Sequence, residues 1–406
     1  MISKKSSSGL DLLNLSLADV RDGIGPFLGI YLLSRHHWNL RDICIVSSIM
    51  TFAGVVTQTP AGALLDKTKN KHLVIGLAAL LIGAGTLLIV IDAGFTAVSI
   101  SQVIVGIAAS FIAPGIAAIT LGLAGYKQLD NRVSRNEMFN HGGNVATALL
   151  SGVLAYYFGL TTVFILTFVL SLLSILALQK IDRNEIDHAL ARGAAQADDK
   201  KIAGKKFLRS TPFLVFTASA VLFHFANAAM LPLAGQYIVA RNNNVNASVY
   251  MSACIIVAQL VMVPVALFCG RFSSRGRKPW MMICFLALPL RGFLYTLSAD
   301  PYYITSIQIL DGLAAGIFGV VSVLTIADIT KGTGQFNLAN SIMITAVGIG
   351  ASLSGAVAGF VAQEFSIEVA FLFLSGVALA ALVVYGIFMQ ETLKTVTPTI
   401  DNPAAG

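Results

Sequence analysis

Long apolar runs dominate this chain and restrict what it can fold into. Twelve such runs, most of about 20 residues, follow one another with short polar breaks. A helix of roughly 20 residues spans the ~30 Å hydrocarbon core of a bilayer, whereas a barrel strand needs only about 9–11. Charged residues make up only 12% of the chain. A soluble domain typically contains about 25%. The sequence therefore predicts an all-α polytopic membrane protein with twelve transmembrane helices.

A polar stretch at 181–210 divides the predicted spans into six and six. We expect an N-terminal six-helix bundle over 1–180, a linker over 181–210, a C-terminal six-helix bundle over 211–390 and a tail over 391–406. The approximate limits of the predicted spans are 12–34, 42–65, 73–92, 96–120, 137–159, 161–180, 212–238, 248–269, 279–298, 302–325, 337–361 and 368–389.

Basic residues lie almost entirely in alternate loops. Most of the 27 Lys and Arg residues occur before the first span, after each even-numbered span, and in the tail. Cytoplasmic loops carry an excess of Lys and Arg, so we expect both termini in the cytoplasm of a bacterial-type inner membrane. The first run has span length and no small-residue cleavage site after it, so we expect an uncleaved helix. The net charge of +7 is then a topology signal and not a nucleic-acid-binding patch.

The first span carries the most unusual residues. Asp19, Arg21 and Asp22 lie near its middle, and Gly25–Pro26 follows, where the helix is loosened. A charge at the bilayer centre costs at least about 2.5 kcal/mol, so such residues face protein or water and mark functional sites. We therefore predict that this part of the first span borders a site.

The two groups of six spans also resemble each other. Gln102 recurs 206 residues later as Gln308, and Pro26 recurs at the same offset as Pro232. A shared offset between several residues indicates an internal repeat. Two six-helix halves in parallel orientation are then related by an axis along the membrane normal.

A short motif joins the second and third spans. It reads Gly62-Ala-Leu-Leu-Asp66-Lys67-Thr-Lys69-Asn-Lys71. With this motif and its six-plus-six layout, the chain resembles a major facilitator superfamily (MFS) transporter, whose pattern here is G-x-L-x-D-R-x-G-R-R/K. Lys67 keeps the charge of the pattern's arginine, and Lys69 replaces its glycine. A degenerate copy at 270–278 contains Arg275 and lacks the acidic residue.

The resemblance implies the MFS fold and a latch between its halves. Gly62 would permit close approach of two helices, and Asp66 would pair with basic groups or with a helix N-terminus across the half interface. Lys67, Lys71 and Arg275 complete the predicted gating motif. Such a latch would favour the outward-facing state.

Two departures from the family pattern bear on the direction of transport. Members that export drugs against protons often carry an arginine in the fourth span and a Gly-Pro pair in the fifth. Here the fourth-span position is Gln102, and the fifth span contains no proline. We therefore favour uptake over drug export.

Polar groups at midplane depth are the candidates for solute and proton binding, because such transporters bind solute there between their halves. Two arginines are predicted to clamp an anionic group, since a guanidinium binds carboxylate or phosphate bidentately. Buried carboxylates and a histidine are predicted to exchange a proton. The predicted solute-binding residues are Arg21, Arg291, Asn227, Gln259, Asn140 and Asn144, and the predicted proton-coupling residues are Asp22, Asp19, Asp311 and His224.

Structural roles remain an alternative for these groups. Arg21 would then pair with an acid in its own or a neighbouring helix, and Arg291 with Asp311. Such pairs can exchange as the halves rock, so pairing does not exclude a transport role. Asn140, Asn144 and Gln259 would form hydrogen bonds between helices.

The chain contains no HExxH-type spacing and no phosphate-binding loop, and its four cysteines lack metal-ligand or disulfide spacing. We therefore predict no enzyme activity, no cofactor and no metal. The sequence favours a monomeric secondary transporter of a small polar, anionic, carboxylate-type solute, coupled to protons. The alternatives are an efflux carrier for a drug-like or secreted compound such as a siderophore, and a non-transporting membrane sensor or scaffold.

Overall fold

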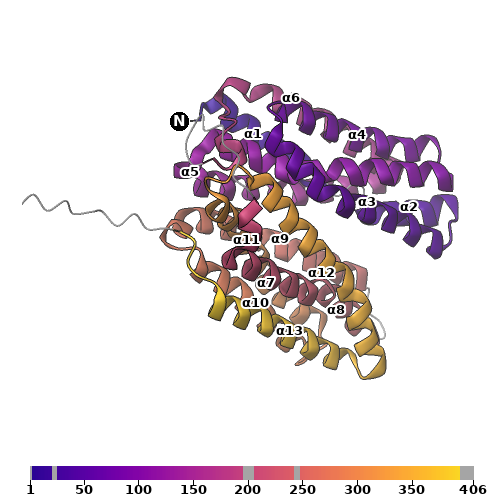
Figure 1. Ribbon diagram of the computed structural model, residues 1–406. Helices are drawn as coiled ribbons and strands as arrows, with labels where there is room; N and C mark the ends of the chain where they lie inside the picture. The colour runs from indigo at the N-terminus through magenta and orange to yellow at the C-terminus, as the bar shows by residue number, and fades with distance from the viewer. Residues whose placement is uncertain (1, 21–24, 195–204, 242–246, 394–406) are drawn as a thin grey trace, which may run out of the picture.

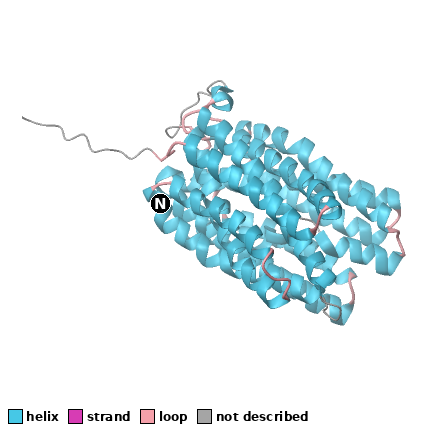
Figure 2. Cartoon of the chain, turned by 90° about the horizontal axis from the view of Figure 1, so that it is seen from below, coloured by secondary structure: helices cyan, strands magenta, loops and turns pink. Residues whose placement is uncertain are grey.

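The computed structural model describes residues 2–20, 25–194, 205–241 and 247–393. Within these residues the secondary structure is entirely helical, as Figure 2 shows. Nine described segments have the length and apolarity of a membrane span. One of them, the long helix α5 (Phe95–Phe158), contains two of the spans expected from the sequence.

The N-terminal half accounts for six spans in its described residues. Its first span consists of two helices, with residues 21–24 between them outside the described part of the chain. The helices of this half are α1 (Lys4–Val20), α2 (Gly25–His36), α3 (Leu40–Lys67), α4 (Lys71–Ile91), α5 (Phe95–Phe158) and α6 (Thr161–Lys180).

The C-terminal half repeats this pattern over the residues that the structure describes. Its first span is again two helices, which meet at Ala229, three residues before Pro232. Proline has no backbone N–H to donate to the preceding turn, so a helix is weakened there. The helices are α7 (Thr211–Ala228), α8 (Met230–Arg241), α9 (Ala247–Phe272), α10 (Lys278–Tyr295), α11 (Pro301–Thr330), α12 (Phe336–Glu364) and α13 (Ile367–Phe388). The predicted twelve-span, all-helical fold class is confirmed.

The chain reverses direction inside α5, where the sequence predicted a loop between separate spans. Gly125 has a φ of +58° and a ψ of 175°, a backbone conformation that glycine adopts without strain. Helix resumes directly after it, so the polar residues 126–136 are helical. The fifth span therefore begins about three turns earlier than its predicted start at residue 137.

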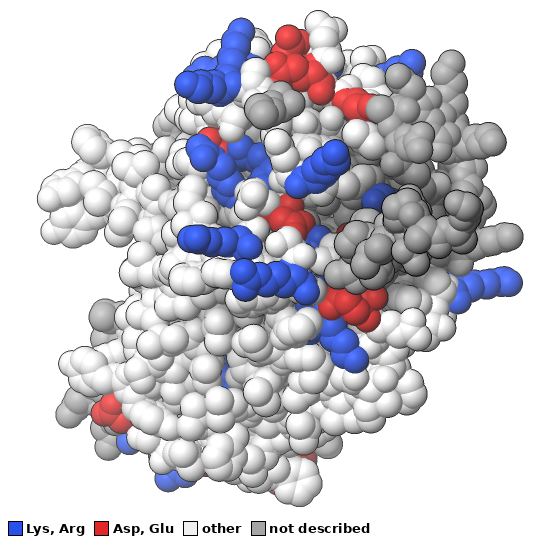
Figure 3. Space-filling model, turned by 90° about the vertical axis from the view of Figure 1, so that its left-hand side faces the viewer, with Lys and Arg blue, Asp and Glu red and all other residues white. Residues whose placement is uncertain are grey.

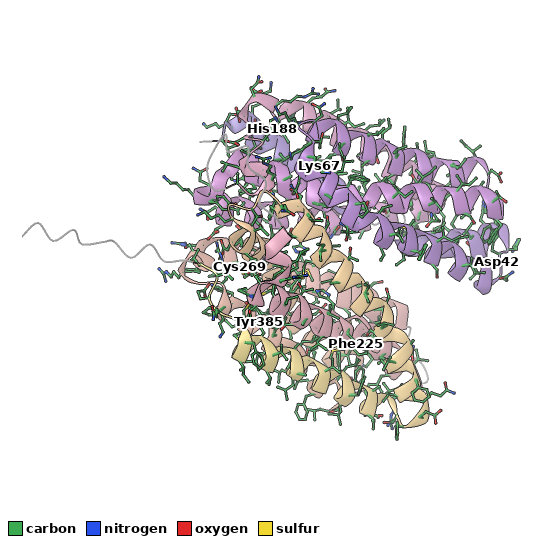
Figure 4. The ribbon with its side chains drawn as sticks, viewed as in Figure 1. Asp42, Lys67, His188, Phe225, Cys269 and Tyr385 are labelled. Atoms are coloured by element: carbon green, nitrogen blue, oxygen red, sulfur yellow. The ribbon has the colours of Figure 1, made fainter. Side chains whose placement is uncertain are left out.

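The two halves converge at one end of the molecule and diverge toward the other (Figure 1). We call the narrow end the basic end and the opposite one the wide end. The basic end carries residues 3–11, 67–71, 126–135, 181–194, 271–278 and 389–393. Figure 3 looks onto the basic end and shows its Lys and Arg side chains. Figure 4 labels His188 at the basic end and Asp42 at the wide end. Across the halves, α3 packs against α12 and α5 packs against α9.

A glycine in each half permits this approach at the basic end. A Cβ added to Gly62 would lie 2.6 Å from Cβ of Ser341 on α12 and would also overlap the carbonyl oxygen of Asn337. A Cβ added to Gly270 on α9 would lie 2.5 Å from Cβ of Ser134 on α5. Gly62 and Gly270 lie in the last turns of corresponding helices, α3 and α9, so the close contact is repeated in the two halves.

We predict that Gly62→Ala separates α3 from α12 at the basic end and destabilises this conformation. Overpacking of a close contact typically costs about 1–3 kcal/mol. The matched control is Gly355→Ala on α12, where an added Cβ meets nothing within 4 Å. The measurements are the unfolding temperature in detergent and maleimide labelling of a cysteine at Thr59, which faces Thr345 across the interface. Equal labelling rates in both glycine variants would contradict the prediction.

Candidate functional site

A cavity of about 330 Å³ lies between the two halves. This volume lies within the range of small-molecule sites, roughly 300–1,000 Å³. Its polar lining comes from both halves, with α1 and α5 on one side and α7, α11 and α12 on the other. The polar residues that line it are Asn14, Thr120, Asn136, Glu137, Asn140, His141, His224, Asn227, Asp311, Ser322 and Asn340.

Arg291 on α10 lies directly behind the cavity wall and is 1% exposed. Its Nη1 donates to Oδ1 of Asp311 at 2.7 Å and to Oδ1 of Asn227 at 2.6 Å. Its Nε donates to the hydroxyl of Tyr295, and its Nη2 donates to Gln308. The ion pair with Asp311, offered by the sequence as the structural alternative, is present. Protein acceptors therefore engage each nitrogen of this guanidinium in the present conformation.

The cavity wall formed by α5 contains a second polar cluster. Oε2 of Glu137 accepts from Nδ2 of Asn140 at 3.3 Å and lies 3.7 Å from Nε2 of His141. The other ring nitrogen, Nδ1 of His141, lies 2.8 Å from Oε1 of Gln259 on α9. This contact joins the two halves. Gln259, predicted to bind solute, does not line the cavity and instead contacts His141 on α5.

Glu137 was not among the predicted site residues, because the predicted fifth span begins at this residue and would leave its side chain at the membrane surface. Because the helix begins three turns earlier, the carboxylate reaches the central cavity. The available signal was the spacing of Glu137 and His141, since residues four apart share one face of a helix.

His224 on α7 lines the cavity beside aromatic rings. Its ring centroid lies 4.7 Å from that of Phe318 and 5.3 Å from that of Phe223, in edge-on geometry. Its Nε2 makes no hydrogen bond with any residue that the structure describes. The proton-coupling role of His224 therefore stays a prediction.

The remaining predicted site residues lie elsewhere. Arg21 and Asp22 fall outside the described residues, as does the side chain of Asp19. Asn144 is half-buried on α5 and is not among the residues that line the cavity. The described cavity therefore brings together Asn140, Asn227, Asp311 and His224 from the predicted sets, with Arg291 behind them.

At the basic end, Asp66 lies at the N-terminus of α12. Its Oδ1 accepts from the backbone N–H of Asn337 at 3.1 Å, and its Oδ2 accepts from the backbone N–H of Leu338 at 2.9 Å. The first N–H groups of a helix lack partners within the helix and attract an anion. Lys71 is buried and donates to a backbone carbonyl of its own loop, while Lys67 is exposed.

A cross-half ion pair of the basic end was not predicted. Arg277 binds Asp130 bidentately, with two N–H···O distances of 2.8 Å, and also donates to Asp328 at 3.0 Å. Asp130 belongs to α5 and Arg277 immediately precedes α10, so the pair joins the halves. Arg275, named from the sequence, is exposed and lies over the ring of Phe272. Only the fold distinguishes these two arginines.

Comparison with known proteins establishes the family. The chain matches the Major Facilitator Superfamily over residues 12–287 and 257–404. It is 42% identical over 402 residues to uncharacterised MFS-type transporters from two strains of Mycobacterium tuberculosis, covering 98% of this chain and 96% of theirs. The chain therefore belongs to the major facilitator superfamily. It is a multi-pass membrane transporter and not an enzyme, as the sequence predicted.

Solved structures agree on the fold. The fucose:proton symporter FucP in its outward conformation superimposes with a TM-score of 0.77 at 14% identity, covering 95% of this chain and 98% of that one. The human organic anion transporter MFSD10 gives a TM-score of 0.69 at 14% identity, covering 94% and 98%. At this identity the likeness concerns the fold alone.

We predict that Arg291 and Asp311 depend on each other for stability. Removing one partner of a buried ion pair typically costs about 3–5 kcal/mol, because the other charge is left unpaired. Arg291→Met should therefore lower the unfolding temperature in detergent more than the double variant with Asp311→Leu does. Arg241→Met, which breaks an exposed pair with Glu368, is the control and should change little. Equal losses in the single and double variants would contradict the pairing.

Proposed function

We propose that this protein is a secondary active transporter that moves a small polar, anionic solute of the carboxylate type together with a proton. The observation that carries the proposal is the Arg291–Asp311 pair in the cavity wall. Asp311 and Asn227 border the cavity, and Arg291 lies behind them with its Nη1 bound to both.

A proton on Asp311 would neutralise the carboxylate and release Nη1 of Arg291. A solute carboxylate entering the cavity would then replace Asp311 as the acceptor, because a guanidinium binds carboxylates in a fork geometry. Either event alone leaves a buried charge unpaired, which is costly. Proton and anion together leave both charges satisfied, so the pair links the binding of one to that of the other.

The basic end would be the cytoplasmic side, in accordance with the charge distribution of the loops. In this conformation two cross-half contacts close that end: Asp66 on the N-terminus of α12, and Arg277 on Asp130. The conformation would then be the outward-facing state, ready to receive solute from outside the cell. Rocking of the halves would break both contacts and release solute inward.

The test begins with the purified protein and a panel of mono-, di- and tricarboxylates, with phosphate esters as comparison. Thermal shift at several pH values identifies the stabilising compound. Its radiolabelled form is then followed in proteoliposomes with and without an imposed proton gradient. We expect an inward proton gradient to accelerate uptake.

We predict that Asp311→Asn abolishes gradient-driven accumulation while solute exchange persists, because an amide exchanges no proton. Arg291→Lys should raise KM for the solute about tenfold, which corresponds to losing ~1.4 kcal/mol of bidentate binding. Arg241→Lys at the wide end is the matched control and should transport normally. Stabilisation by none of the carboxylates, or uptake independent of both residues, would contradict the proposal. Transport of the compound outward would identify an efflux carrier.

A further inference from the structure

Glu137 lies where the two halves touch inside the cavity. The carboxylate comes from α5 of the N-terminal half, and a Cβ added to Gly319 on α11 would lie 3.3 Å from its Oε2. Its side chain is 23% exposed. A carboxylate of one half thus packs against a glycine of the other, which leaves room for it and offers no side-chain donor.

His141 connects the same carboxylate to a second helix of the opposite half. Its Nε2 faces Oε2 of Glu137 at 3.7 Å, and its Nδ1 lies 2.8 Å from Oε1 of Gln259 on α9. Glu137 and His141 therefore form a pair on α5 that the C-terminal half contacts at both ends. The Arg291–Asp311 pair differs, because all its partners lie within one half.

We propose that Glu137 and His141 together form a second proton-binding site, which holds a proton while α5 contacts α9 and α11 and loses it when they separate. The proposal deepens the proton coupling proposed above and depends on it for its role in transport. The proton on Glu137 and His141 would control the separation of the halves, whereas the proton on Asp311 would control the binding of solute.

Whether the pair holds a proton determines whether both acceptors of His141, on Gln259 and on Glu137, face an N–H donor. With the proton bound, imidazolium donates through Nδ1 to Gln259 and directs its Nε2–H toward the carboxylate of Glu137, so both charges are paired. Without it, neutral imidazole has one N–H for two acceptors. A carboxylate that is partly buried without a charged partner is unfavourable. Separation of the halves admits water to that carboxylate, so loss of the proton to water favours separation.

Other charged and titratable groups near the cavity already have different surroundings. Asp311 of α11 is bound to Arg291, and Asp11 of α1 is bound to Arg132 and Arg135 toward the basic end. His224 of α7 lies among aromatic rings. The described residues of α9 and α12 contribute neutral amides to this region, Gln259 and Asn340. Among the residues that the structure describes, His141 is the basic side chain within 4 Å of the Glu137 carboxylate.

The test measures the separation of the halves without any solute. Spin labels are placed at Tyr157 on α5 and Tyr302 on α11, which are 71% exposed or more and lie at the wide end of opposite halves. The four native cysteines are replaced beforehand, and the protein is held in lipid nanodiscs. Double electron–electron resonance then gives the distance between the two spin labels from about pH 5 to about pH 9, the range in which an ordinary histidine changes its charge.

We predict that the wild-type chain populates mainly the long distance between the wide-end labels at acid pH. At alkaline pH the ratio of the short-distance to the long-distance population should rise several-fold. Glu137→Gln, which keeps the shape of the side chain and removes the carboxylate that would be left unpaired, should remain in the acid distribution throughout. His141→Gln should also lose the pH response, and serves as the second variant if Glu137→Gln does not fold.

Two controls test whether the response belongs to Glu137 and His141. Glu364→Gln removes an exposed carboxylate at the end of α12 and should respond like the wild type. Glu368→Gln removes the carboxylate that pairs with Arg241 at the wide end and should also retain the pH response. A wild-type distance that does not change with pH, or a Glu137→Gln variant with the wild-type profile, would overturn the proton site. Because no solute is present, failure of the carboxylate uptake experiment leaves this readout intact.

Discussion

The contact between Asp66 and the N-terminus of α12 is the interaction on which the arrangement of the halves depends. It places one carboxylate against two backbone N–H groups that a helix cannot satisfy itself, and it does so across the interface. The contact requires α3 and α12 to approach closely, and Gly62, one turn earlier, has no side chain to prevent this. When the basic end is closed in this way, the cavity is left between halves that diverge toward the wide end (Figure 1).

Residues 181–194, the first described part of the polar stretch between the halves, take part in this closure. Asn337, which binds Asp66, also donates to the backbone carbonyl of Ala191, and the carbonyl of Gly193 accepts from the N–H of Gly332. Residues 186–191 in turn pack against Gly122 on α5. Part of the polar stretch is therefore a third layer beneath both halves. Rocking of the halves has to carry or release it.

Two acid–base pairs in the cavity are placed differently with respect to the moving parts. Arg291 and Asp311 lie within the C-terminal half, so their distance need not change as the halves rock, and a bound solute can compete for the arginine. Glu137 and His141 lie on the N-terminal half and contact α9 and α11 of the other. A pair within one half suits binding, and a pair held between halves suits sensing of their separation.

The sequence by itself determined the number and position of most spans, their division into two related halves and the transporter family. Apolar runs of bilayer length leave the backbone little alternative to helix, because hydrocarbon offers no other hydrogen-bond partner. It also indicated the Arg291–Asp311 pair, since two opposite charges at the same depth require a partner. Tertiary structure alone decided the depth of Glu137, which depends on the reversal at Gly125, and the choice of Arg277 over Arg275 as the partner of Asp130. Both depend on contacts between distant segments, and no local pattern of residues specifies those contacts.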